Sequence, residues 1–160
     1  HAESRLIDNQ EEIVERIFRE ANQLAGEQFG RNTQITSLSG GQSRALMIAD
    51  TAILSSSPII LIDEIENAGI NREKALELLV GEEKIVLMAT HDPILALMGD
   101  KRIIINNGGI KDIIVTTAEE KELMKELKVL DKVLMDLRDD LRYGKNLSRI
   151  SGELAAVKNA

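Results

Sequence analysis

Apolar side chains in the first part of the chain recur at the spacing of an α-helix. Over Glu11–Ala25 they fall on one stripe of a helical surface. The stripe consists of Ile13, Val14, Ile17, Phe18, Ala21, Leu24 and Ala25. This pattern predicts an amphipathic helix, and Gly26 and Gly30 mark its end.

A second helix is expected after the polar loop that spans residues 31–37. We predict that it begins inside the pair Gly40-Gly41 and ends near Ser55. Pro58 follows shortly afterwards, and proline lacks a backbone N–H and disfavours helical conformation in the preceding residue.

Two short runs of consecutive apolar residues predict strands. Ile59–Ile62 and Ile85–Met88 each hold four such residues, which is typical of parallel strands buried on both faces. A helix is expected between them, over Asn71–Leu79. This alternation predicts an α/β fold with right-handed βαβ units and a mostly parallel sheet flanked by helices.

The next part of the chain predicts a short helix and a hairpin. The helix is expected near Pro93–Met98. The segments Arg102–Asn106 and Ile110–Thr116 flank Asn107-Gly108-Gly109, a turn signal because glycine tolerates positive φ.

A long charged helix is predicted over Glu119–Tyr143, with leucines at alternating steps of four and three. These are Leu123, Leu127, Leu130, Leu134, Leu137 and Leu141. Such a seam favours packing on the chain's own sheet or on a missing half of the fold, with a homodimer as the alternative. One further helix is expected within Gly144–Ala160.

Composition narrows the function. A net charge of −7, without a cluster of basic residues, disfavours direct binding of nucleic acid. Cysteine is absent, which fits a reducing cytoplasm. The apolar runs are far shorter than the roughly 18 residues of a spanning helix, so we expect a cytoplasmic protein that reaches a membrane only through a partner.

The segment Leu38-Ser39-Gly40-Gly41-Gln42 combines a hydroxyl with bare backbone N–H groups at a predicted helix start. Such an end attracts phosphate, because its N–H groups point outward and the helix dipole is positive there. Taken in isolation, however, Ser-Gly-Gly is more often an ordinary N-cap with a flexible turn.

Two acids and one histidine follow the predicted strands. Asp63 and Glu64 come directly after the first strand, and His91 follows the second. Open α/β sheets bind ligands at the carboxyl ends of their strands, so these side chains are candidates for a shared site. Each could instead be a solvated strand-end residue or a structural histidine.

The order and spacing of these motifs resemble the later half of the ATP-binding-cassette (ABC) ATPase domain, with its signature, Walker B and switch-histidine motifs. The resemblance covers roughly residues 11–116. It implies a partial P-loop-NTPase-like fold over residues 1–116, with a helical subdomain at about 10–56 and a core at about 57–116. Residues 117–160 would be a helical extension.

The resemblance also implies roles for the site residues. Ser39, Gly40, Gly41 and Gln42 would meet the γ-phosphate of ATP across a dimer interface. Asp63 would help to hold Mg²⁺. Glu64 would polarise the attacking water and His91 would donate a hydrogen bond to the γ-phosphate.

The chain departs from the family at several points. The P-loop pattern Gly-x-x-x-x-Gly-Lys-Ser/Thr is absent, so we predict that this polypeptide alone neither binds nor hydrolyses ATP appreciably. The P-loop half, or a second ABC subunit, would be supplied elsewhere, and its strand would lie between the strand Ile85–Met88 and the strand Arg102–Asn106. The segment after Glu64 also lacks the family's usual proline and loop aspartate.

Three functions remain open. The first is an ATP-hydrolysing subunit that powers a transmembrane transporter. The second is a soluble, non-transport ABC ATPase of the DNA-repair or translation type. The third is a non-catalytic interaction module built on the leucine helix, in which the motifs would be vestigial.

Overall fold

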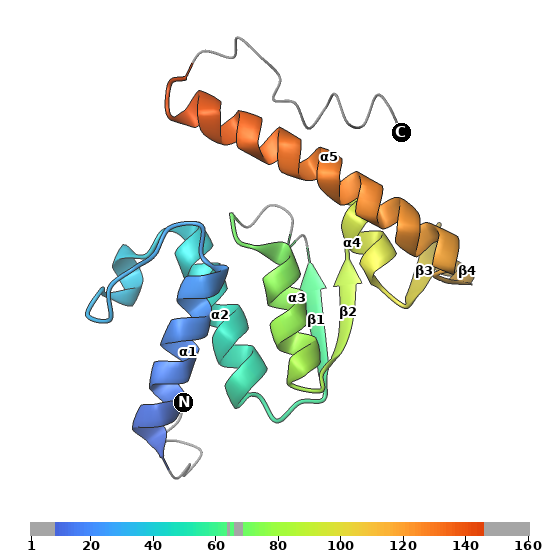
Figure 1. The fold of residues 1–160 in the computed structure, drawn as a ribbon. Coiled ribbons are helices and arrows are strands. Elements are labelled where there is room, and N and C mark those ends of the chain that lie inside the picture. The colour runs from blue at the N-terminus through green and yellow to red at the C-terminus, as the bar shows by residue number, and fades with distance from the viewer. Residues whose placement is uncertain (1–8, 64, 66–68, 146–160) are drawn as a thin grey trace. The chain divides into compact units, whose positions relative to one another are not determined.

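The computed structural model describes residues 9–63, 65 and 69–145, which form two compact units, residues 1–90 and residues 91–160 (Figure 1). The predictions made for Glu64 and for residues 146–160 lie outside the described residues.

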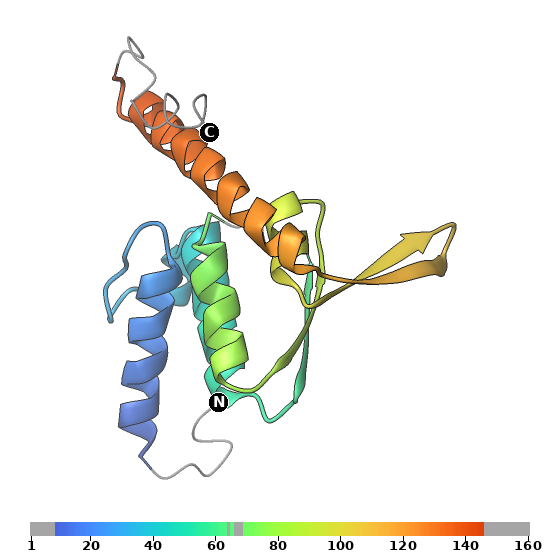
Figure 2. The ribbon, with the colours of Figure 1, turned by 45° about the vertical axis from the view of Figure 1, so that its right-hand side comes forward.

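The first unit contains three helices that lie side by side (Figures 1 and 2). They are α1 (Gln10–Leu24), α2 (Gly40–Leu54) and α3 (Arg72–Gly81), with a short 3₁₀ helix, η2 (Ile35–Ser37), before α2. α1 packs against α2, and both contact α3. Small residues on α2 allow this close approach, and they are buried: Ala45, Ala49 and Ala52. The helices predicted from the periodicity are confirmed to within about two residues at each end.

Two strands complete the first unit. β1 (Ile59–Asp63) and β2 (Ile85–Ala89) are parallel and in register, with Ile59 opposite Ile85. α3 connects them and contacts β2, as expected for a βαβ unit.

The expectation that both faces of these strands are buried is wrong. On one face Leu61 is 77% exposed and Leu87 is 47% exposed, whereas Ile60 on the other face is buried. Both strands are apolar at nearly every position, so the pattern could not indicate which face is covered. Among the described residues of this unit, helices protect only one face.

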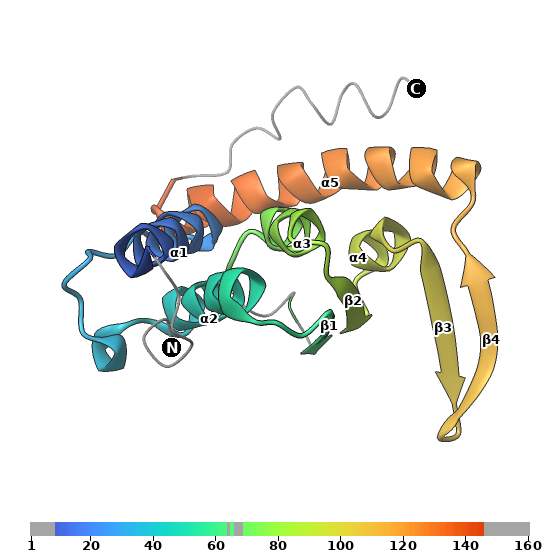
Figure 3. The same cartoon turned by 90° about the horizontal axis from the view of Figure 1, so that it is seen from below.

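The second unit contains α4 (Pro93–Met98), the strands β3 (Lys101–Asn106) and β4 (Gly109–Val115), and α5 (Ala118–Arg142). α4 packs against α5, and β3 pairs with β4 as an antiparallel hairpin (Figure 3). Asn107 and Gly108 form its two-residue turn with φ of 49° and 77°. Two consecutive positive φ values are typical of a type I′ turn, which confirms the predicted hairpin.

The strands of the described residues form two separate two-stranded sheets, β1–β2 and β3–β4. The α/β class with a parallel strand pair and a long carboxy-terminal helix is thus confirmed. The expected boundaries at residues 10–56, 57–116 and 117–160 follow functional motifs rather than compactness, and they stay a prediction.

The leucine seam of α5 is partly exposed. Leu123, Leu134 and Leu141 are 49%, 52% and 60% exposed. Leu127 and Leu137 are half-buried, and Leu130 is 36% exposed. A homodimer through these side chains stays a prediction. Within residues 9–63, 65 and 69–145 there is no helix with the length and apolar character needed to cross a bilayer.

Candidate phosphate-binding site

The Ser-Gly-Gly motif forms the start of α2. Ser39 has extended backbone angles, and its Oγ accepts a hydrogen bond from the N–H of Gln42 at 3.3 Å. In return, Gln42 Oε1 accepts a hydrogen bond from the N–H of Ser39 at 2.9 Å. This reciprocal pair is a capping box, so Ser39 is an N-cap and not a residue inside a helix.

The capped end leaves other donors facing outward. Gly40 and Gly41 occupy the first two helical positions, where the helix itself offers no acceptor for an N–H. The first turn holds no acidic residue, so the positive end of the helix dipole is not neutralised locally. A Cβ added to Gly40 would meet no atom within 4 Å, which shows that the surface above it is open. These features suit an external anion.

Gln42 also anchors the loop that precedes α2. Its Nε2 donates hydrogen bonds to the carbonyl oxygens of Glu27 at 3.2 Å and Gln28 at 3.5 Å. The amide thus caps the helix with its oxygen and holds the loop with its nitrogen. This second role of Gln42 was not expected from the sequence.

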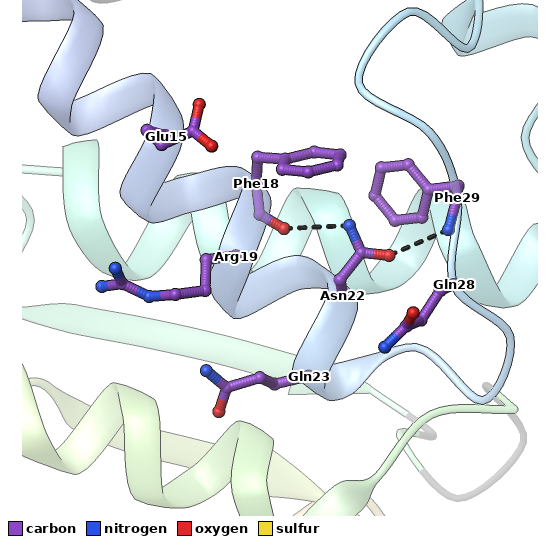
Figure 4. A pocket seen from close by; sticks show the side chains of 7 residues that line it. All are labelled: Glu15, Phe18, Arg19, Asn22, Gln23, Gln28 and Phe29. Carbon is purple, nitrogen blue, oxygen red and sulfur yellow. Dashed lines mark hydrogen bonds between the residues drawn. The ribbon is translucent and has the colours of Figure 1, made fainter.

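The same loop is held from its other side by α1. The N–H of Phe29 donates to Asn22 Oδ1 at 2.9 Å, and Asn22 Nδ2 donates to the carbonyl oxygen of Phe18 at 3.2 Å (Figure 4). The rings of Phe18 and Phe29 meet edge to face, with centroids 5.6 Å apart. They border a shallow pocket of about 410 Å³. Its lining is Glu15, Phe18, Arg19, Asn22, Gln23, Gln28 and Phe29. No sequence motif indicated this pocket.

The end of β1 lies at the same end of the unit as the start of α2 (Figure 1). α2 and β1 run in opposite directions and are joined by a short connection, residues 55–58. Asp63, the last residue of β1, is exposed. The candidate phosphate donors and the first candidate metal ligand thus belong to one end of one unit.

Gly69, which follows β1 in the chain, lies near the start of α2. Gly69 has a φ of +63°, and a Cβ added to it would lie 4.0 Å from the Cα of Gly41. A Cβ added to Gly26 would lie only 3.1 Å from the carbonyl oxygen of Gly69, so a side chain there would require the neighbouring backbone to shift. Gly69 therefore lies near the glycine pair at the start of α2, and a side chain at Gly26 or Gly69 would be strained.

Hydrogen bonds hold this segment against the end of α1. The N–H of Asn71 donates to the carbonyl oxygen of Leu24 at 2.8 Å, and Ala25 forms an isolated antiparallel bridge with Ile70. The side chain of Asn71 then caps α3 by accepting from the N–H of Lys74 at 3.1 Å. Asn71 therefore has a structural role here.

The remaining site residues are not brought to this end by the described contacts. Glu64 lies outside the described residues. His91 is exposed and is the first residue of the second unit, so its approach to Asp63 stays a prediction. The neighbouring Asp92 caps α4, accepting hydrogen bonds from the N–H groups of Ile94 at 2.9 Å and Leu95 at 3.0 Å.

The described residues supply only part of the ligand set that Mg²⁺ needs. No group of three or more histidine, cysteine, aspartate or glutamate side chains gathers in the part of the chain that the structure describes. Mg²⁺ in nucleotide sites is bound through one or two carboxylates, phosphate oxygens and water. Asp63, an exposed carboxylate at a strand end, fits one of those positions.

A second capping box, not identified from the sequence, begins α5. Thr117 Oγ1 accepts from the N–H of Glu120 at 3.2 Å, and Glu120 Oε2 accepts from the N–H of Thr117 at 3.0 Å. Glu120 also pairs with Arg102 of β3. The hydrogen bond from Arg102, followed by that from the N–H of Thr117, lowers the pKa of Glu120. The Thr-x-x-Glu spacing was a readable signal for this cap.

Comparison with known proteins yields one close relative. The chain is 53% identical over 148 residues to a protein of Methanocaldococcus jannaschii named as an uncharacterised ABC transporter ATP-binding protein. The match covers 92% of this chain and 56% of that protein, so the chain spans little more than half the relative's length. No family model matches the chain, and no solved structure matches it. This similarity supports the view that the chain is of the ABC ATPase type.

Proposed function

We propose that this chain forms part of an ABC-type ATPase and binds the terminal phosphate of ATP at the start of α2. The observation that carries the proposal is the start of α2, where a capping box leaves the N–H groups of Gly40 and Gly41 facing outward in a turn without acidic residues. Helix starts with free N–H groups bind phosphate, and carboxylates at strand ends are typical of ligand sites in open α/β sheets, so both features suit a nucleotide-binding protein.

The relative supports the same conclusion, because it is named as an ATP-binding protein. The match covers 56% of its length, so the relative has room for a further half of the domain. In the proposal, a P-loop-bearing half holds the β-phosphate and completes the domain. Neither a P-loop lysine nor its glycine cradle exists in this chain. Alone, the polypeptide would therefore show no appreciable ATP binding by calorimetry.

Each motif has one task in the proposed site. The N–H groups of Gly40 and Gly41 and the hydroxyl of Ser39 bind the γ-phosphate of a nucleotide held by the P-loop of a second subunit. Asp63 would help to hold Mg²⁺, and the ion would supply positive charge beside the phosphate oxygens. Glu64 orients and deprotonates the attacking water, and His91 donates a hydrogen bond to the γ-phosphate.

The relative's name includes transport, so we favour an ATPase that powers a transmembrane partner. The alternative is a soluble, non-transport ABC ATPase. The unusual segment Ile65–Ile70 favours this alternative, because it lacks the family's usual loop aspartate. Co-purification of the complete protein with membranes or with ribosomes distinguishes the two.

The test is reconstitution with a P-loop-bearing half, using the part of the M. jannaschii relative that this chain does not match. We expect Mg²⁺-dependent ATP hydrolysis by the mixture. Glu64→Gln should lower turnover at least about a hundredfold while ATP-driven dimerisation persists, since it removes the base and keeps the shape. Glu77→Gln, which changes an exposed acid on α3, is the matched control. Equal turnover in both variants would refute the role of Glu64 as the base, and a mixture that does not hydrolyse ATP would support the non-catalytic module instead.

A further inference from the structure

The leucine seam of α5 leaves one apolar stripe exposed. Four of its side chains are between 36% and 60% exposed: Leu123, Leu130, Leu134 and Leu141. Leu123 and Leu130 are seven residues apart, as are Leu134 and Leu141, and residues seven apart differ by only about 20° around an α-helix. The four side chains therefore share one face of α5, which we call the leucine face.

The helix that packs on α5 within the second unit is too short to cover this face. α4 contacts α5 and has six residues. At a rise of 1.5 Å per residue, α4 is about 9 Å long, whereas the leucine face extends over about 27 Å. A long apolar stripe on a helix normally packs against another element. The leucine face therefore has room for a further element.

The end of α5 turns the chain out of the helix. Gly144 has a φ of +70°. Its N–H donates to the carbonyl oxygen of Leu141 at 3.0 Å, and the N–H of Lys145 donates to that of Asp140 at 2.8 Å. These two bonds and the left-handed glycine form a Schellman motif, which ends a helix. Lys145 Nζ also binds Asp140 Oδ1 at 2.7 Å. A short loop fixed in this way suits a hairpin of two antiparallel helices.

The sequence beyond Lys145, which lies outside the described residues, mirrors the apolar spacing of α5 about Gly144. Leu147 comes three positions after Gly144, and Leu141 comes three positions before it. Leu154 and Leu134 are likewise each ten positions from Gly144. The apolar residues of this segment follow one another at steps of three and four, the spacing of one helix face: Leu147, Ile150, Leu154 and Val157. The segment thus matches the leucine face in register.

We propose that residues 147–157 cover the leucine face by packing antiparallel to α5, as the second helix of a helical hairpin. Leu147 would lie against Leu141, and Leu154 against Leu134. The short connection gives the segment a high effective concentration at this face, which a separate partner lacks. The inference does not depend on the ATPase proposal, because it involves only α5 and the residues that follow it.

A second copy of the chain fits the leucine face less well. With the leucines at the a and d positions of a heptad, Glu126 is a g residue and Asp131 the e residue that follows it. In a parallel pair of α5 helices, Glu126 of one copy would face Asp131 of the other. Like charges in these positions oppose pairing. The chain's own segment avoids this repulsion, and α5 with it would form a self-contained extension.

A disulfide test measures the proposed pairing directly, because the chain contains no cysteine. Leu134→Cys combined with Leu154→Cys introduces the two thiols at a proposed pair. Lys132→Cys with Leu154→Cys is the matched control, since Lys132 is exposed and about 200° away from Leu134 around α5. With oxidised glutathione, we expect the first pair to form an intramolecular disulfide in at least about tenfold higher yield than the control. Intact mass and non-reducing gels measure the yield.

Hydrogen exchange on the unaltered chain gives an independent measurement. A covered leucine face predicts slow amide exchange within residues 147–157. Leu154→Lys should restore fast exchange there, because it buries a charge against Leu134, whereas Asn159→Lys should not. Fast exchange in the unaltered chain, or equal disulfide yields from the two cysteine pairs, would overturn the proposal. A disulfide between two chains that forms more readily with Leu134→Cys alone than with Lys132→Cys alone would replace the segment with a second copy.

Discussion

The starts of α2 and α5 have the same kind of hydrogen-bonded cap, a capping box, but the charge of their first turns differs. In α2, Ser39 and Gln42 exchange hydrogen bonds, and in α5, Thr117 and Glu120 do the same. The first turn of α5 contains Glu119 and Glu120, whereas that of α2 contains no acid. The same local motif therefore builds two ends with different electrostatic properties.

The difference shows in the pKa values of the α5 acids. Hydrogen bonding to its own backbone N–H, followed by that to Thr117, lowers the pKa of Glu119. Arg102 and the N–H of Thr117 lower that of Glu120. α5 thus satisfies its helix dipole with its own carboxylates, while α2 leaves the positive end to an external anion. A capping box alone does not distinguish the two helix starts; the acid-free glycine turn of α2 is the feature on which the proposed phosphate site rests.

Among the changes that test this comparison of helix starts, the largest effect on ATP turnover is expected when the start of α2 is made to resemble that of α5. Gln42→Glu keeps the capping box, because glutamate serves at that position in α5. It adds a negative charge beside the proposed phosphate and removes the Nε2 donor to Glu27. We expect ATP turnover of the reconstituted protein to fall about tenfold to a hundredfold, while unfolding free energy changes by less than about 1 kcal/mol. Steady-state kinetics and urea unfolding measure the two quantities.

The reverse change, Glu120→Gln in α5, is the control for Gln42→Glu and should leave turnover unchanged. If Gln42→Glu leaves turnover unchanged as well, α2 does not receive the phosphate. Its open glycine start would then be a structural feature only.

Removing each cap hydroxyl should have equal effects on stability and unequal effects on function. Ser39→Ala and Thr117→Ala each lose one side-chain acceptor for a backbone N–H. Each should destabilise its helix start by about 1 kcal/mol. Hydrogen exchange, read separately over α2 and α5, measures this local loss. Only Ser39→Ala should also raise the ATP concentration needed for half-maximal turnover, and an equal rise in Thr117→Ala would remove the distinction between the two helices.

The smallest expected effect is a pH dependence confined to the second unit. The pKa of Glu120 is lowered in the folded chain, so its stabilising contribution is present above the ordinary glutamate pKa and is lost as pH falls through the lowered value. Glu120→Gln should remove this part of the acid destabilisation, which begins near the ordinary glutamate pKa of about 4.3 and continues as pH falls through the lowered value. Glu119 titrates in both proteins, so the difference between them isolates Glu120. Urea unfolding at a series of pH values measures the unfolding free energy of both proteins. If the two free energies fall in parallel as pH decreases, Glu120 does not make this contribution.

Local sequence signals located most elements because their causes lie within a few residues. The apolar stripe predicted α1, Pro58 predicted where α2 ends, and Asn107-Gly108 predicted the hairpin turn. The cap of α2 was also readable, since Ser39 and Gln42 are only three residues apart. The equivalent cap at Thr117 has the same spacing to Glu120, but the helix was predicted to begin two residues later, at Glu119.

The site could be predicted only in part. The sequence identified Ser39, Gly40, Gly41, Gln42 and Asp63 as candidates, and these share one end of the first unit. It could not reveal that Gln42 holds the carbonyls of Glu27 and Gln28, or that Phe18 and Phe29 border a pocket. Such contacts join residues from different elements, and no local pattern encodes them.

By itself, the sequence determined the helices, the strands, the parallel pairing and the capped glycine turn, because hydrophobic period and backbone preference act over short distances. Only the tertiary structure decided which face of β1–β2 is covered and that Gly69 approaches Gly41. The reason is that both strands are apolar on each face, so burial depends on where a helix from elsewhere in the chain packs.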